Sequence, residues 1–245
     1  MAGQEPIDFD ASSIAALFAA GPAGTYVTID DFPVQPGASG RAVLRRFEVV
    51  APAARIEVTG PRGDLSVPMP PVAHFRGHIE GERGSIVYLA AQQDKVVAYV
   101  QTSGGRSYVG PDESNLQYVL RTVDSPLNER AATSEWRCQT EDLPEAPVSV
   151  APRVWSEGLG SIPPDVTSNG YKKAEVDVET DNQLYTSFGG DVNALGAYVA
   201  TLFGADDVIY DNELALHLTV NLIHTWSVPD PYVGPAASDQ LNQLG

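Results

Sequence analysis

The chain has 245 residues and a mass of 26.1 kDa, with 43% hydrophobic and 19% charged residues. This balance supports the core of one large domain or two small ones and excludes wholesale disorder. No apolar run approaches the ~20 residues that a membrane-spanning helix needs, so a membrane-spanning protein is excluded. The start, MAGQEPIDFD, has neither the basic region nor the apolar stretch of a signal peptide. A single cysteine, Cys138, excludes an internal disulfide framework.

The net charge is −17 and is unevenly placed. Residues 1–138 carry 12 basic and 16 acidic side chains, whereas residues 139–245 carry 3 basic and 16 acidic ones. A surface with this much negative charge repels phosphate groups, which argues against nucleic acid and anionic membranes as partners. The uneven split predicts two regions of different character.

Short segments rich in valine, isoleucine and tyrosine dominate residues 1–140, separated by turn-forming residues. They favour antiparallel hairpins in a sandwich or barrel. A short helix is predicted first, over 14–20, with Asp10 or Ser12 as its N-cap. The predicted strands are 25–32, 41–50, 54–60, 72–80, 85–91, 95–102, 104–110 and 115–123.

A proline-rich connector is predicted over 141–170, because proline fixes its own φ and disfavours helix in the residue before it. Beyond it, residues 171–245 have a different pattern. AEVDVET (174–180) alternates like a strand with one buried face, and a helix is predicted over 189–214 with Asp191 as N-cap. A long strand is predicted over 214–226.

Strand, helix and strand in this order predict a parallel βαβ unit, which cannot stand alone because its sheet edges are open. The predicted buried stripe of the helix consists of Val192, Leu195, Val199, Leu202 and Ile209. The predicted buried face of the second strand consists of Leu216, Leu218, Val220 and Leu222. The expected fold class is therefore α+β: an antiparallel sandwich- or barrel-like region followed by an incomplete α/β piece.

None of the four histidines is placed to share a metal ion with another. On a strand, His74 and His78 lie about 13 Å apart, too far to share an ion bound at about 2 Å. His217 and His224 are seven residues apart, so their side chains point to opposite faces of a strand. Structural or surface roles are favoured for all four.

The acidic residues Glu175, Asp177, Glu179 and Asp181 alternate with the apolar face of their strand. A solvated strand face is the favoured interpretation, and a calcium site is the alternative. Cys138 lies among polar neighbours directly before the connector. Free cysteine usually packs as a small buried hydrophobe, whereas these surroundings suggest an accessible thiol with a function.

Two segments carry a resemblance to a known family. Residues 74–111, HFRGHIEGERGSIVYLAAQQDKVVAYVQTSGGRSYVGP, resemble the prodomain of adamalysin-type (reprolysin-like) zinc metallopeptidases of the secreted bacterial kind. Residues 171–228, with YKKAEVDVETD, FGGDVNALGAYVATLFGADDVIYDNEL and LALHLTVNLIHTW, resemble the start of the metzincin catalytic domain that follows such a prodomain.

The resemblance implies a secreted zinc metalloendopeptidase precursor that acts on peptide or protein substrates. Its prodomain would contact its own catalytic domain, assist the folding of that domain and inhibit it. The family zinc motif, H-E-x-x-H-x-x-G-x-x-H with a later Met-turn, is absent, since no His-Glu pair occurs and the methionines are Met1 and Met69. The chain is therefore expected to be a prodomain with the first part of a catalytic domain, without peptidase activity of its own.

The resemblance also assigns roles to two residues. Cys138 corresponds to a prodomain thiolate that occupies the open zinc position and displaces the catalytic water. Glu175, six residues before Asp181, lies where some members place a structural calcium ligand. The alternative hypothesis is a non-enzymatic extracellular β-rich module for binding or adhesion.

Overall fold

The computed structural model describes residues 4–7, 11–112, 117–122 and 172–232. The fold is α+β, as predicted, with a curled antiparallel sheet that forms a half-barrel and a second, smaller sheet. The predicted connector and the boundaries drawn around it lie outside the described residues, as does Cys138.

The larger sheet has the strand order β1-β10-β9-β8-β7-β6-β3-β2, and every neighbouring pair is antiparallel. Its strands are β1 (Gln4–Ile7), β2 (Tyr26–Gln35), β3 (Ala38–Phe47), β6 (Ala73–Ile79), β7 (Ile86–Ala91), β8 (Val96–Thr102), β9 (Gly105–Pro111) and β10 (Tyr118–Thr122). All but β1 were predicted from the sequence. Helix α1 (Ala11–Ala19) contacts β6 and β7.

The smaller sheet joins the two regions that the sequence separated. Its order is β11-β12-β4-β5, with β11 (Lys172–Glu179), β12 (Leu216–Trp226), β4 (Val50–Gly60) and β5 (Gly63–Pro68). Strand β12 is parallel to β11, as the predicted βαβ unit requires, and is also parallel to β4 on its other side. The hairpin of β4 and β5 therefore covers an edge that the βαβ unit alone would leave open.

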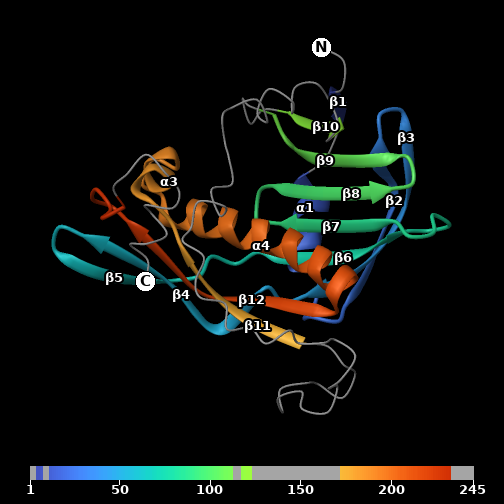
Figure 1. Ribbon diagram of the computed structural model, residues 1–245. Coiled ribbons are helices and arrows are strands. Elements are labelled where there is room, and N and C mark those ends of the chain that lie inside the picture. The colour runs from blue at the N-terminus through green and yellow to red at the C-terminus, as the bar shows by residue number, and fades with distance from the viewer. Residues whose placement is uncertain (1–3, 8–10, 113–116, 123–171, 233–245) are drawn as a thin grey trace, which may run out of the picture.

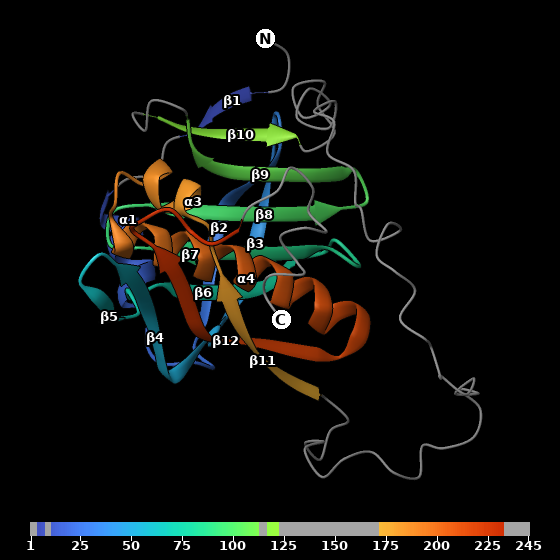
Figure 2. The same cartoon turned by 60° about the vertical axis from the view of Figure 1, so that its left-hand side comes forward.

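Helix α4 (Val192–Leu214) lies between the two sheets (Figures 1 and 2). It packs against β12 and β4 on one side and against β6 and β7 on the other. Asp191 caps it as predicted, with its carboxylate accepting from the backbone N–H groups of Asn193 and Ala194. A further short helix, α3 (Asn182–Ser187), was not predicted.

Strand β7 is buried on both faces because a helix packs on each. Val87 and Leu89 belong to the hydrophobic core with α1, and Tyr88 and Ala90 belong to the core with α4. A strand buried on both faces appears in the sequence as a continuous apolar run, which here is IVYLAA.

Two predicted faces are wrong in detail. Leu202 was placed on the buried stripe of α4 but is 48% exposed, because glycine and alanine, including Gly196 and Ala200, form much of the buried surface of this helix. Leu222 was placed on the core face of β12, but a register shift between Val220 and Leu222 turns Ile223 to the core instead.

A buried hydrogen-bonded chain connects α4 to the larger sheet. The Tyr88 hydroxyl donates to the carbonyl oxygen of Thr201 at 2.8 Å and lies 2.9 Å from Nδ1 of His74. Since the single hydroxyl proton goes to the carbonyl, Nδ1 of His74 must donate to the Tyr88 oxygen. Burial, with the nearby charge of Arg46, lowers the pKa of His74 to about 3, so this imidazole is neutral.

Gly204 allows α4 to approach this chain closely. A Cβ at Gly204 would collide with the Tyr88 hydroxyl and would lie 2.8 Å from Cζ of Tyr88 and 2.9 Å from Nδ1 of His74. Glycine costs ~1 kcal/mol relative to alanine inside a helix. At this position, the helix is therefore locally less stable, and the close packing against Tyr88 and His74 requires the glycine.

A second buried contact involves Asp207 of α4, whose side chain is fully buried. Its Oδ1 accepts from the backbone N–H of Leu218 at 2.6 Å and lies 2.7 Å from Nδ1 of His217. Arg76 of β6 lies 3.6 Å from Oδ2 of Asp207 and 3.0 Å from Asp211. A buried carboxylate is costly unless it is paired, and here groups from both sheets compensate it.

We expect Gly204→Ala to lower the free energy of unfolding by about 2 kcal/mol, although alanine favours helix, because overpacking a core typically costs 1–3 kcal/mol. Urea unfolding measures this free energy for the wild type and the variant. The cost should fall in a Tyr88→Phe background, which removes the colliding hydroxyl, and should not vanish, since the ring remains. Gly196→Ala is the matched comparison and should cost less, because its closest contact would be the flexible end of Ile56 and it would come no nearer than 3.0 Å to the Pro70 ring. Stabilisation by Gly204→Ala would contradict this packing.

Candidate functional site

The strongest polar cluster lies at the carboxyl ends of the parallel strands β4, β11 and β12. In open parallel sheets, this edge is where ligands usually bind. Glu179 ends β11, His224 and Trp226 lie at the end of β12, and Thr59 lies near the end of β4. Tyr232 joins them from the segment that follows β12.

The carboxylate of Glu179 is the centre of this cluster. It accepts hydrogen bonds from Nε1 of Trp226 and from the hydroxyl of Tyr232, both at 2.6 Å. Nδ1 of His224 lies 2.7 Å from Oε2 and 2.9 Å from Oε1 of the same carboxylate. An ionised carboxylate only accepts, so Nδ1 of His224 carries a proton.

The other ring nitrogen of His224, Nε2, contacts a residue of the N-terminal region, residues 1–140. Nε2 lies 2.9 Å from Oγ1 of Thr59, which also lies 2.7 Å from Oδ1 of Asp64 on β5. The threonine hydroxyl has one proton. That proton goes either to the Asp64 carboxylate or to Nε2 of His224.

Hydroxyl, imidazole and carboxylate in this order form the arrangement that activates nucleophiles in many hydrolases. Here Asp64 competes with His224 for the Thr59 proton, which works against a nucleophilic role for the hydroxyl. The arrangement links Thr59 and Asp64 of the first region to Glu179 and His224 of the second by charge-assisted hydrogen bonds.

Aromatic rings cover one side of the cluster. The rings of His224 and Trp226 are 4.9 Å apart and tilted, and those of Trp226 and Tyr232 meet edge to face at 6.2 Å. Burial and the hydrogen bond to Glu179 raise the pKa of Tyr232 to about 12, so its hydroxyl is a proton donor at neutral pH.

The chain after β12 is held in place by α3. The backbone N–H groups of Asn182 and Tyr232 donate to the carboxylate of Asp230, at 2.8 and 3.0 Å. The side-chain amide of Asn182 donates to the carbonyl oxygen of Trp226 at 2.8 Å. These bonds bring Tyr232 next to Glu179.

Two of the four acidic residues of the alternative calcium site, Glu175 and Asp181, have local partners. Glu175 pairs with Nζ of Lys173 at 3.0 Å, and Asp181 accepts from the backbone N–H of Leu184 as the N-cap of α3. Among the described residues, no three or more His, Cys, Asp or Glu side chains are grouped to hold a metal ion. The calcium role of Glu175 stays a prediction, as does the zinc role of Cys138.

The sequence pattern missed Glu179. It was grouped with Glu175 and Asp177 on a solvated face, and those two are exposed as expected. Glu179 is half-buried because His224 and Trp226 of the neighbouring strand reach it. Aligning the predicted ends of the two parallel strands is the sequence signal that could have found this cluster.

The four histidines do not converge, as predicted. His74 is buried against Tyr88, and His78 on the same strand is exposed. His217 contacts Asp207 near the start of β12, and His224 contacts Glu179 near its end.

No protein-family model matches this chain, and no curated protein matches it. None of the described helices is long and apolar enough to cross a membrane. The candidate site therefore rests on its own geometry.

We expect Glu179→Gln to lower the free energy of unfolding by about 2 kcal/mol, because hydrogen bonds to charged groups contribute about 1.5–3 kcal/mol each and an amide replaces only some of them. Glu175→Gln is the matched control on the same strand. It is exposed, and its ion-pair partner within the described part of the chain is Lys173, so its effect should stay within about 0.5 kcal/mol. Urea unfolding of both variants measures the difference, and equal effects would contradict the role assigned to Glu179.

Proposed function

We propose that this chain is the front part of a secreted, adamalysin-type zinc metalloendopeptidase precursor. Residues 1–140 act as a prodomain that assists the folding of the catalytic domain and inhibits it. Residues 171–245 are the start of that metzincin-like catalytic domain. The complete enzyme hydrolyses peptide or protein substrates. The proposal rests on the family resemblance of 74–111 and 171–228.

The pairing of β12 with β4 is the observation that supports the folding role. A prodomain that assists folding must offer surface that the catalytic region lacks. Here the hairpin of β4 and β5 extends the sheet of β11 and β12, and the larger sheet covers the face of α4 turned away from β12. The clusters around Glu179 and Asp207 add hydrogen bonds between the same two regions.

The described residues do not fit a zinc site, because they contain no suitable group of three or more ligands. No step of peptide hydrolysis is therefore assigned to them. The proposal requires a zinc-binding segment that is encoded after Gly245, with Cys138 as the inhibitory thiolate.

Sequencing the locus through and beyond the codon for Gly245 tests the peptidase assignment. We expect an open frame that encodes H-E-x-x-H-x-x-G-x-x-H, which supplies three imidazole ligands and a general base. A confirmed stop codon, with no such motif in any frame, would overturn the assignment for this chain.

The folding role predicts that the two regions stay together after the chain between them is cut. A specific protease site placed within 141–170 allows the purified chain to be cleaved, and gel filtration then measures the association. We expect both fragments to elute as one complex, because α4 is packed between the two sheets and β12 pairs with β4.

Two neighbouring substitutions provide the control. Ile223→Asp places a carboxylate in the core against α4 and should release the second fragment, because an unpaired buried charge is strongly destabilising. Leu222→Asp makes the same change at a half-buried position outside that core and should leave the complex intact. Separation of the unsubstituted fragments without denaturant would refute the folding role.

A second candidate function is the non-enzymatic binding module. A hollow in the half-barrel, on the face of the larger sheet opposite α4, favours it. This function needs no zinc motif, so the sequencing result separates the two candidates.

A further inference from the structure

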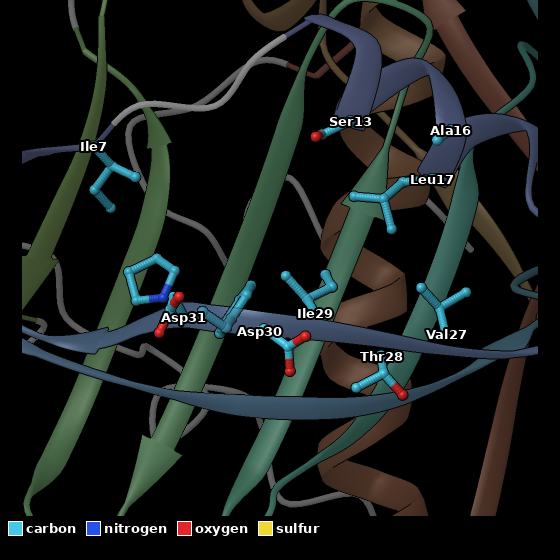
Figure 3. A pocket seen from close by; sticks show the side chains of 11 residues that line it. Ile7, Ser13, Ala16, Leu17, Val27, Thr28, Ile29, Asp30 and Asp31 are labelled. Atoms are coloured by element: carbon cyan, nitrogen blue, oxygen red, sulfur yellow. The ribbon is translucent and has the colours of Figure 1, made fainter.

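A hollow opens between α1 and β2 (Figure 3). Its volume is about 510 Å³. Small-molecule sites usually measure ~300–1,000 Å³. Helix α1 is nine residues long and contacts β6 and β7, and the hollow lies beside it, next to β2.

The wall of the hollow is largely apolar. Leu17 of α1 and Phe32 of β2 are buried in the core beneath it. The other apolar side chains of the wall are partly buried or exposed, which leaves apolar surface for a ligand: Ile7, Ala16, Val27, Ile29 and Pro33.

A β-bulge shapes the rim. The pairing of β2 with β3 shifts between Ile29 and Phe32, so β2 has one extra residue there. The shift keeps Ile29 and Phe32 in the wall and leaves Asp30 and Asp31 exposed at the rim. Asp31 has a φ of 54°, in the left-handed region that aspartate and asparagine tolerate better than most residues. Bulges often re-aim side chains beside functional sites.

The charge of the rim is negative and only partly compensated. Asp30 forms an ion pair with Arg41 at 3.2 Å, whereas Asp31 forms no ion pair within the described part of the chain. A smaller neighbouring hollow shares Asp31 and adds Glu5. The described residues that line the two hollows include no lysine, arginine or histidine.

We propose that this hollow binds a small amphipathic cation. The apolar body of the ligand lies against Leu17 and Ile29, and its ammonium group lies beside the carboxylate of Asp31. The Asp31 carboxylate would repel an anionic ligand, whereas a neutral ligand would gain no electrostatic attraction from it. This binding site is independent of the peptidase assignment.

The test compares three ligands of equal length on the intact 245-residue chain: octylammonium, 1-octanol and octanoate. Calorimetry, at concentrations below those at which the ligands aggregate, gives the three dissociation constants. We expect octylammonium to bind up to about fivefold more tightly than octanol, since one exposed charge pair supplies at most a factor of this order. Octanoate should bind most weakly.

Three variants locate the binding. Asp31→Asn removes the charge and tolerates the left-handed φ, so it should bring octylammonium to within about twofold of octanol. Ala16→Phe fills the hollow from the exposed side of α1 and should weaken all three ligands. Glu48→Gln removes an exposed charge outside the hollow and should change nothing, which controls for the attraction of cations to a chain of net charge −17.

The proposal is overturned if the wild-type chain binds none of the three ligands or binds octylammonium no better than octanol. It is also overturned if Asp31→Asn keeps the full preference for the cation, because the preference would then come from the overall charge. Circular dichroism and thermal unfolding confirm that each variant is folded before its binding is interpreted.

Discussion

The structure depends on the burial of α4 between two sheets. A helix packed on both sides needs small residues where the contact is closest, and Gly196 and Gly204 meet this need at the two sheets. It also needs compensation for any charge that it buries. Asp207 is fully buried on this helix, and Leu218, His217 and Arg76 surround its carboxylate from β12 and β6. The helix therefore fixes the smaller sheet to the larger one.

Strand β12 is the element through which the two regions of the chain meet. A carboxylate–imidazole pair lies near each of its ends, His217 with Asp207 at the start and His224 with Glu179 at the end. Between them, its backbone pairs with β11 on one side and β4 on the other. Parallel sheets are usually covered on both faces. Here α4 covers one face, and the exposed Glu175 and Asp177 of β11 lie on the other.

The two functional candidates lie on opposite faces of the larger sheet. One face carries α4 and the contacts on which the proposed folding role depends. The other carries α1 and the hollow beside Asp31. Strand β7 separates them, with Tyr88 turned to one core and Leu89 to the other.

Alternation, turn residues and caps were sufficient to place most strands of the larger sheet, the long helix with its Asp191 cap, and the parallel βαβ unit, because these depend on local sequence. The tertiary structure alone decided which strand covers the open edge of β12, since pairing between residues 50–60 and 216–226 leaves no local pattern. It also decided which side chains of α4 are buried, because contact from two sides replaces a single apolar stripe with glycine and alanine. The cluster at Glu179 arises from the same cause: a carboxylate that alternates like a solvated residue becomes half-buried when His224 and Trp226 of the next strand reach it.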